Sequence, residues 1–321
     1  MNKPKLFITR KLPDKIIEPI SHNIDISMWE ESLIPVPRER LLKEAACSDG
    51  LLTMLSDQID ETLLAASPRL KVVANLAVGY DNIDIEACKK HGVSACNTPD
   101  VLTDTTADLA FALLLATARR IPEAAELVKT GEWHEWGPYL MAGKDVHHKT
   151  LGIVGMGRIG SAVAKRARGF DMEIVYHNRS RSLYEDEIGA RYVSFETLLK
   201  TADYVLCLAP LTKETKHLFN AEAFRMMKKD AIFINVGRGG SVDEEALTRA
   251  LVTGEIAGAG LDVFKKEPID ADHPLLALKQ VVALPHIGSA SKETRDRMAA
   301  LALENIHAVL VKGEQPKTPI F

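Results

Sequence analysis

The chain has 321 residues, 46% of them hydrophobic and 26% charged, a composition typical of a globular protein with about two domains. Its 40 Lys and Arg residues against 44 Asp and Glu residues leave a net charge of −4, so we expect no nucleic-acid partner and no membrane binding. No apolar run is long enough for a bilayer span or a signal peptide, and the four cysteines form no C-x-x-C pair, so we expect a soluble, cytoplasmic protein.

Short β-rich runs alternate with helical patterns from the N-terminus onward. Strands are predicted at residues 4–9, 23–29, 50–55, 70–76 and 93–97, with helices between them, at 14–21 and 37–46 among others. Residues 101–130 form the longest helical segment, which Pro122 should end or kink near Ile121. Residues 131–148 are irregular. A second series of strands follows at 150–154, 173–176, 204–208, 231–235, 257–262 and 281–284, and the chain ends in a helix at about 292–311.

This alternation predicts βαβ units and parallel sheets that are buried on both faces. The expected fold class is α/β, with two Rossmann-like parallel-sheet domains, one flavodoxin-like and one dinucleotide-binding, and a cleft between them. The last helix cannot bury its apolar face alone, so we expect it to pack on the first domain. The predicted domains are a substrate (catalytic) domain at 1–98 plus 290–321 and a dinucleotide-binding domain at 99–289.

Residues 151–160, LGIVGMGRIG, contain the spacing G-x-G-x-x-G between a predicted strand and a predicted helix. Gly155 would permit a tight turn, Gly157 would let the backbone approach a pyrophosphate, and Gly160 would let helix and strand pack closely. A strand–helix turn without a ligand is the alternative.

The next predicted strand ends in HNRSR, residues 177–181. Enzymes that prefer NAD usually have an acidic residue here to accept bonds from the ribose 2′-hydroxyl. This chain has Asn178, Arg179 and Arg181 instead, and guanidinium groups pair well with a 2′-phosphate. The segment therefore predicts NADP(H) as the preferred cofactor, with NAD(H) possible. A solvated basic loop is the alternative.

Polar residues follow three consecutive strands of the second series, where an open parallel sheet binds its ligands. They are Arg238, then Asp262 with Glu267, then His286. An Arg suits a substrate carboxylate, and a His transfers protons near neutral pH, aided by a carboxylate that orients its ring. Together they predict reduction of a 2-keto acid beside a nicotinamide, although each residue alone has an ordinary structural explanation.

The chain resembles the D-isomer-specific 2-hydroxyacid dehydrogenase family over essentially its whole length. The match rests on the segments NLAVGYDNID (75–84), NTPDVLTDTTADLAFALLL (97–115), LGIVGMGRIG, INVGRGGSVDEEAL (234–247) and GLDVFKKEP with LPHIGSAS (260–291). Within the family it is most similar to the glyoxylate/hydroxypyruvate reductases that also reduce 2-ketogluconate. The stretch DVHHKTLGIVGMGRIG and the HNRSR segment indicate this branch.

The resemblance implies a role for each matching residue. Arg238 would hold the substrate carboxylate and carbonyl, His286 would be the general acid, and Glu267 would be its partner. Backbone N–H groups of Val78 and Gly79 would complete the carboxylate site. The implied cofactor-binding residues are Thr106, Gly155, Gly157, Arg158, Ile159, Gly160, Asn178, Arg179, Ser180, Arg181, Pro210, Thr215, Val236, Gly237, Arg238, Asp262, His286 and Gly288.

The resemblance also implies a homodimer joined through the nucleotide-binding domain, with the helix near 101–120 in the contact, although core packing would explain its apolar residues as well. Where the family has a bulky residue over the adenine, this chain has Ala209. Two roles are open for Trp136 and Met141: contact with an active site, including a neighbouring subunit's, or local packing. We expect no metal site, because His147 and His148 lack a third ligand at a useful spacing.

Four other functions share this fold. Phosphoglycerate dehydrogenases and D-lactate dehydrogenases have the same motifs, and some co-repressors use the fold to sense dinucleotides without catalysis. Formate dehydrogenases replace the Glu partner of the His by Gln, which Glu267 argues against. The sequence thus predicts a reductase that forms D-2-hydroxy acids from glyoxylate, hydroxypyruvate or 2-keto-D-gluconate, and it does not rank these three substrates.

Overall fold

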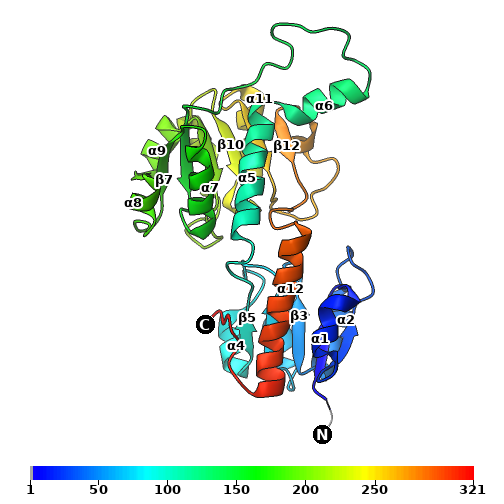
Figure 1. Cartoon of the computed structure of the whole chain (residues 1–321). Helices are drawn as coiled ribbons and strands as arrows, with labels where there is room; N and C mark the ends of the chain where they lie inside the picture. Colours follow the sequence, from blue (N-terminus) through cyan, green and yellow to red (C-terminus); the bar gives the residue numbers. More distant parts are fainter. Residues whose placement is uncertain (1–2) are drawn as a thin grey trace. The chain divides into compact units, whose positions relative to one another are not determined.

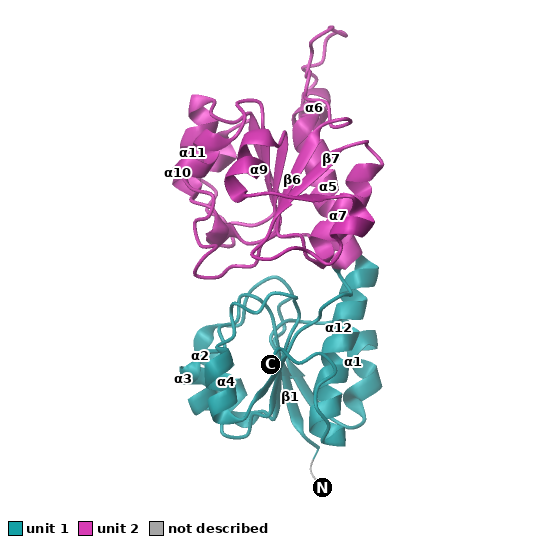
Figure 2. Ribbon diagram, turned by 90° about the vertical axis from the view of Figure 1, so that its left-hand side faces the viewer, with its two compact units in different colours: residues 1–102, 291–321 teal, residues 103–290 magenta. Residues whose placement is uncertain are grey.

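A computed structural model describes residues 3–321 of the chain, which divide into two compact units. Unit 1 contains the chain up to Leu102 together with Ser291–Phe321, and unit 2 contains Thr103–Ala290 (Figure 2). These boundaries differ by a few residues at most from those expected from the sequence. Both units are built on parallel sheets, which confirms the predicted α/β fold class.

Within the described residues, unit 1 has a five-stranded parallel sheet in the order β2-β1-β3-β4-β5. This is the strand order of flavodoxin-like folds. The central strands are buried along their whole length because helices cover both faces. The strands are β1 (Lys5–Ile8), β2 (Asp25–Met28), β3 (Gly50–Thr53), β4 (Val72–Asn75) and β5 (Ser94–Cys96).

The helices of unit 1 lie on the two sides of this sheet. Figure 2 shows α1 (Asp14–Ser21) and α12 (Lys292–His307) on one side, and α2 (Arg38–Cys47), α3 (Glu61–Ala65) and α4 (Ile85–His91) on the other. The C-terminal helix α12 packs on β3 and β4, and a π-helical segment, Ala308–Lys312, continues it. A Cβ on Gly50 would lie 3.0 Å from Leu310, so the small residue in β3 lets this segment pack closely.

Unit 2 has a seven-stranded parallel sheet among the described residues, in the order β12-β11-β10-β9-β6-β7-β8. The order reverses next to β6, so the loops after β6 and β9 flank the point at which such sheets bind nucleotides. The strands are β6 (Thr150–Val154), β7 (Glu173–His177), β8 (Arg191–Tyr192), β9 (Tyr204–Cys207), β10 (Ile232–Asn235), β11 (Gly258–Leu261) and β12 (Val281–Ala283).

Helices also cover both faces of the unit 2 sheet (Figure 2). One side carries α5 (Thr103–Ala118) and α7 (Arg158–Arg168), and the other carries α9 (Phe195–Thr201), α10 (Ala221–Met226) and α11 (Glu244–Thr253). The short helix α8 (Glu185–Ile188) precedes β8, and the 3-10 turns Gly239–Ser241 and Pro274–Ala277 lie in loops. The sequence pattern did not predict β8, because a two-residue strand carries no periodic signal.

The predicted helix at 101–130 is two helices, α5 and α6 (Ile121–Lys129). The break comes at Arg120, which adopts a left-handed conformation, and Pro122 lies in the first turn of α6. Proline is favoured there because its missing N–H has no helical partner in a first turn. Much of the apolar run in α5 is buried in unit 2, so core packing accounts for it.

Helix α6 and the loop that follows it are much more exposed to solvent than α5. Helix α6 has no buried residue, and Figure 1 shows a long loop between α6 and β6. Residues 131–148 contain neither helix nor strand, as predicted. Within residues 3–321, no helix combines the length and the apolar character needed to cross a bilayer.

Candidate active site

The glycine loop connects β6 to α7 in unit 2. Gly155 has φ +106°, and a Cβ there would lie 2.6 Å from the backbone nitrogen of Ala209. A Cβ on Gly160 would lie 2.5 Å from the carbonyl oxygen of Gly155. Both glycines are therefore required by the fold itself, as turn and as close helix–strand contact.

Gly157 is different, because nothing in the fold requires a glycine there. Its φ is −93°, which any residue adopts, and a Cβ would meet no atom within 4 Å. The residue is exposed at the N-terminus of α7, where free N–H groups and the helix dipole favour an anion. Open space above a backbone at a helix N-terminus fits the pyrophosphate of a dinucleotide, with Arg158 and Ile159 following in the first turn.

The segment after β7 is held to this loop by Asn178. Its Oδ1 accepts from the Met156 N–H at 2.7 Å, and its Nδ2 donates to the Met156 carbonyl at 3.2 Å. The sequence predicted a contact between Asn178 and the ribose phosphate, but its amide already bonds the glycine loop. Arg179 and Ser180 are exposed beside it, while Arg181 pairs with Glu185 at 3.1 Å.

His286 and Glu267 form a hydrogen-bonded pair, with Nδ1 2.7 Å from Oε2. The other oxygen of Glu267 accepts from the Phe264 N–H at 2.9 Å. Burial alone would raise the pKa of Glu267, but the His286 bond, the Phe264 N–H and the positive charge of Arg238 outweigh it and lower that pKa. The carboxylate is thus ionised, so Nδ1 carries the proton it donates, and Nε2 remains for a ligand.

Asp262 fixes the backbone on which His286 stands. It is fully buried at the end of β11, and its two oxygens accept from the N–H groups of Ile287 and Gly288, each at 2.8 Å. Burial raises the pKa of Asp262, against the effect of those bonds. His286 has φ +53°, an unfavourable conformation for a residue with a Cβ, and these two bonds hold it.

Four of the implied cofactor-binding residues, Thr106, Val236, Asp262 and Gly288, lie together. A Cβ on Gly288 would be 3.2 Å from Oδ2 of Asp262, 3.3 Å from Cγ2 of Thr106 and 3.6 Å from Cγ1 of Val236. The structure thus brings residues from α5, β10, β11 and the loop after β12 to one small region of unit 2. That they contact one cofactor stays a prediction.

Arg238 lies in the loop after β10, which Asn235 shapes from the buried end of that strand. Asn235 accepts from the Gly237 N–H and donates to the Arg238 carbonyl, each at 3.1 Å. Gly239 touches the backbone of Phe264 so closely that a Cβ would overlap it. The Arg238 loop is therefore packed against the loop that carries Glu267. Sequence reasoning missed Asn235, whose signal was a polar residue ending an apolar strand.

The loop after β9 is closed by its own threonine. The hydroxyl of Thr215 donates to the Pro210 carbonyl at 2.6 Å and accepts from the Thr212 N–H at 2.7 Å. The structure thus places Pro210 and Thr215 together, next to Ala209, whose backbone lies against Gly155.

Val78 and Gly79 lie in unit 1, in the loop that follows β4. The Val78 carbonyl accepts from Asn97 at 2.7 Å, and the Gly79 carbonyl accepts from Asn75 at 2.9 Å. The loop stands at the carboxyl end of the unit 1 sheet, where such sheets bind ligands. The sequence predicted the loop but not the two asparagines that hold it.

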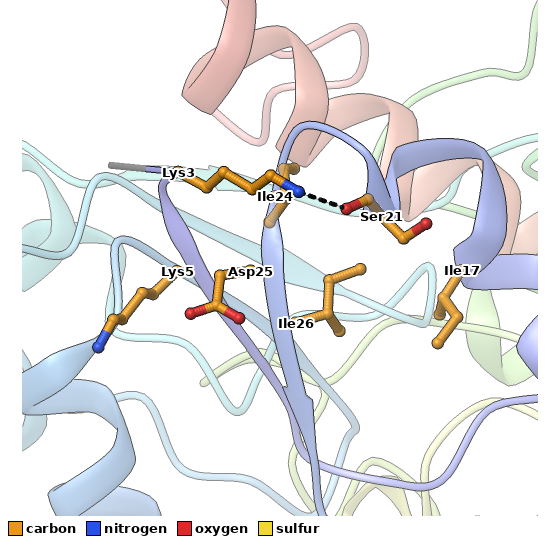
Figure 3. Close-up of a pocket in the computed structure, with 7 residues that line it drawn as sticks. All are labelled: Lys3, Lys5, Ile17, Ser21, Ile24, Asp25 and Ile26. Carbon is orange, nitrogen blue, oxygen red and sulfur yellow. Dashed lines mark hydrogen bonds between the residues drawn. The ribbon is translucent and has the colours of Figure 1, made fainter. Parts of the chain in front are cut away.

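Unit 1 also has a hollow that lies away from the loop after β4. Its volume is about 530 Å³, and Figure 3 shows it lined by Lys3, Lys5, Ile17, Ser21, Ile24, Asp25 and Ile26. The hollow lies between α1 and the amino ends of β1 and β2, opposite to the ligand-binding ends of the strands. We assign it no function. Among residues 3–321, no cluster of three His, Cys, Asp or Glu side chains could hold a metal.

Comparison with known proteins identifies the family. The model of the D-isomer specific 2-hydroxyacid dehydrogenase NAD binding domain matches residues 111–288, more than half of the chain. The chain belongs to this family. It is an oxidoreductase whose second unit is of the family's NAD-binding type.

Individual relatives cover the whole chain. It is 51% identical over 319 residues to a glyoxylate reductase of Thermococcus litoralis, spanning 98% of this chain and 96% of that one. The crystal structure of a Thermus thermophilus protein matches with a TM-score of 0.93 at 43% identity, over 99% of this chain and 100% of that one. An NADPH-dependent glyoxylate/hydroxypyruvate reductase of Sinorhizobium meliloti, solved with NADP and malonate, matches with a TM-score of 0.87 at 33% identity, over 99% and 97%.

Proposed function

We propose that the protein reduces small 2-keto acids to D-2-hydroxy acids, with NADPH as the preferred cofactor. The observation that carries the proposal is the His286–Glu267 pair, in which Nδ1 lies 2.7 Å from Oε2 at the strand ends of a dinucleotide-binding unit. The pair supplies a group for proton transfer, and the family supplies the reaction class. Unit 2 is the dinucleotide-binding domain and unit 1 is the substrate domain.

The roles of the side chains follow from their geometry. Bound NADPH supplies a hydride, which reduces the substrate carbonyl carbon. His286 donates the proton from Nε2 to the carbonyl oxygen, because Nδ1 is bonded to Glu267. Glu267 orients the ring, while Arg238 binds and polarises the substrate. The backbone N–H groups of Val78 and Gly79 bind the substrate carboxylate.

The preference for NADPH rests on the segment after β7. The segment has no carboxylate to accept from a ribose 2′-hydroxyl, and Asn178 bonds the Met156 backbone. Arg179 is exposed and next to that position, so its guanidinium is available to a 2′-phosphate. The Sinorhizobium meliloti relative is NADPH-dependent, in line with this assignment.

Three substrates are proposed: glyoxylate, hydroxypyruvate and 2-keto-D-gluconate. The relative from Thermococcus litoralis is a glyoxylate reductase, and the one from Sinorhizobium meliloti is named for glyoxylate and hydroxypyruvate. The third substrate rests on the sequence branch alone.

The decisive experiment follows the loss of reduced-nicotinamide absorbance in purified protein. NADPH and NADH are each tested with the three substrates and, in separate assays, with pyruvate and phosphohydroxypyruvate as alternative substrates. Rapid NADPH oxidation with one of the three is expected. A strong preference for NADH would contradict the cofactor assignment, and binding of NADPH without any turnover would favour a dinucleotide sensor.

Arg179 offers a sharper test of the cofactor assignment. Arg179→Ala should weaken NADPH binding about tenfold, the value of one charge-assisted bond, and leave NADH binding unchanged. Arg225→Ala, which changes an exposed arginine of α10 in the same unit, is the matched control. An equal loss for both cofactors would show that Arg179 is structural.

The protein acts as a homodimer joined through unit 2, in which a second copy covers the apolar arm, defined as residues 121–140. Six large apolar side chains of this arm are exposed: Ile121, Val128, Trp133, Trp136, Tyr139 and Leu140. Trp136 is 77% exposed and Tyr139 is 85% exposed, which a monomer in water would rarely maintain. Light scattering should give twice the mass of the chain, and a monomer would contradict the assignment.

The protein resides in the cytoplasm. All four cysteines, Cys47, Cys88, Cys96 and Cys207, are free thiols, which is usual in reducing compartments. Recovery of the protein outside the cytoplasm after cell fractionation would contradict this.

A further inference from the structure

Three successive carbonyl groups in the loop after β4 are each held by a hydrogen bond. The Ala77 carbonyl accepts from the N–H and the hydroxyl of Thr98, at 2.9 and 3.1 Å. The Val78 carbonyl accepts from Nδ2 of Asn97 at 2.7 Å, and the Gly79 carbonyl accepts from Nδ2 of Asn75 at 2.9 Å. Side chains therefore fix the orientation of three consecutive peptide groups.

Fixing a carbonyl also fixes an N–H. In a trans peptide the N–H points opposite to the carbonyl of the same unit, so these bonds orient the N–H groups of Val78, Gly79 and Tyr80. None of the three donates a hydrogen bond to any atom in residues 3–321. Backbone donors that are oriented but unused suit a carboxylate, which only accepts.

Asn75 is the buried member of this arrangement, with no exposed surface. Besides Gly79, its Nδ2 donates to Oδ1 of Asn82 at 3.1 Å. Its Oδ1 accepts from the Thr53 hydroxyl at 3.1 Å and from Nδ2 of Asn82 at 3.3 Å. Both the oxygen and the nitrogen of the amide are thus hydrogen-bonded, which fixes the orientation in which Nδ2 bonds the Gly79 carbonyl.

The network continues behind Asn82 into the loop after β3. Nδ2 of Asn82 donates to the carbonyls of Met54 and Asp57, at 3.1 and 2.8 Å. The carboxylate of Asp57 accepts from the Met54 N–H at 2.8 Å and from the Thr9 hydroxyl. Loops after β1, β3 and β4 are joined into one rigid support, which ends at the Gly79 carbonyl.

We propose that Asn75 is a positioning residue for the substrate carboxylate. It holds the Gly79 peptide so that the N–H groups of the loop meet the carboxylate without reorganisation. This inference rests on the proposed function, because it needs a carboxylate substrate on that loop. Preorganised donors lower the cost of binding, so loss of Asn75 should weaken substrate binding more than it slows the chemical step.

The test compares Asn75→Ala with Thr53→Val in the full-length protein. Asn75→Ala removes the bond to Gly79, whereas Thr53→Val removes a bond from the same network and leaves Gly79 held. For Asn75→Ala we expect KM for glyoxylate to rise about tenfold with kcat within about threefold, as expected for lost ground-state and transition-state binding alike. The NADPH dissociation constant should not change. Thr53→Val should keep the wild-type KM at a comparable loss of stability.

A second variant guards against misfolding. Asn75→Ser keeps a polar group next to Thr53 and Asn82 but is too short to reach the Gly79 carbonyl, so it should show the same rise in KM. A wild-type KM in both Asn75 variants, or an equal rise in Thr53→Val, would overturn the proposal. Loss of folded protein in both Asn75 variants would also overturn it, because the role would then be purely structural. A wild-type protein that reduced no 2-keto acid would instead contradict the proposed function.

Discussion

The two units shape their ligand-facing loops in different ways. In unit 2 the glycine loop is shaped by Gly155 and Gly160, which lie within six residues of each other, and Gly157 between them leaves open space. In unit 1 the loop after β4 is shaped by side chains from several separate segments, with Asn75 and Asn82 at the centre. The loop in unit 2 is thus shaped by residues close together in the sequence, whereas the loop in unit 1 is shaped by residues far apart.

This difference explains how the two halves divide the proposed work. In the proposed function, backbone geometry set by glycine would give access to a large anion, and the His286–Glu267 pair in the same unit would supply the proton. A network of buried amides fixes the loop that is proposed to bind a small carboxylate. Substitutions in unit 2 should therefore affect chemistry and cofactor, and those around Asn75 should affect KM.

The largest expected effect is that of His286→Ala. Loss of a positioned general acid should lower kcat about 100- to 10,000-fold, because proton transfer then falls to solvent. NADPH affinity should change little, as measured by fluorescence titration. His147→Ala, which changes an exposed histidine of the same unit, is the control. Intact turnover in His286→Ala would remove His286 as the acid.

The glycine loop allows the next comparison, between Gly157→Ala and Gly155→Ala. The first places a Cβ in open space and should weaken NADPH binding about tenfold, while costing no more than about 1 kcal/mol of stability as an altered N-cap. The second forces a residue to φ +106° against Ala209, so it should destabilise the fold by more than about 2 kcal/mol. Urea unfolding and cofactor titration measure both. Equal losses of stability would show that Gly157 is structural.

The charge on Glu267 predicts a pH dependence of stability. Its folded pKa lies below the ordinary value of 4.5, since the His286 bond, the Phe264 N–H and Arg238 outweigh burial. The stabilisation is therefore present above pH 4.5 and is lost as the pH falls through the folded pKa. The difference in free energy of unfolding between wild type and Glu267→Gln should shrink as the pH falls below 4.5 and through the folded pKa. A difference that grew on acidification would contradict the sign.

The smallest expected effect is a difference in stability between variants of two buried serines, Ser241 in unit 2 and Ser67 in unit 1. Ser241, next to the Arg238 loop, has a fully buried hydroxyl without a hydrogen-bond partner in residues 3–321. Ser241→Ala should therefore leave stability unchanged or raise it by up to about 1 kcal/mol. Ser67→Ala in unit 1 breaks a bond to the Leu63 carbonyl at 2.8 Å and should lower it by about 1 kcal/mol. Thermal unfolding that gave the same sign for both would contradict this difference.

The sequence predicted those features of the structure that depend on residues close together in the chain. The alternating strands and helices, the glycine loop, and the polar residues Arg238 and Asp262 that follow β10 and β11 could all be predicted in this way. The Asn178–Met156 bonds and the Asn75 network could not, because they join residues 22 and up to 48 positions apart through folds of the backbone. The left-handed Arg120 was equally hidden, since Pro122 was the only helix-breaking signal nearby.

One measurement tests the central claim most directly. NADPH deuterated at both C4 positions is incubated with the enzyme and glyoxylate, and the glycolate formed is examined by mass spectrometry. Direct hydride transfer predicts one deuterium atom on the former carbonyl carbon. The proton of the new hydroxyl group comes from water through His286. Oxidation of NADPH that gave glycolate without deuterium, or no glycolate at all, would contradict the account.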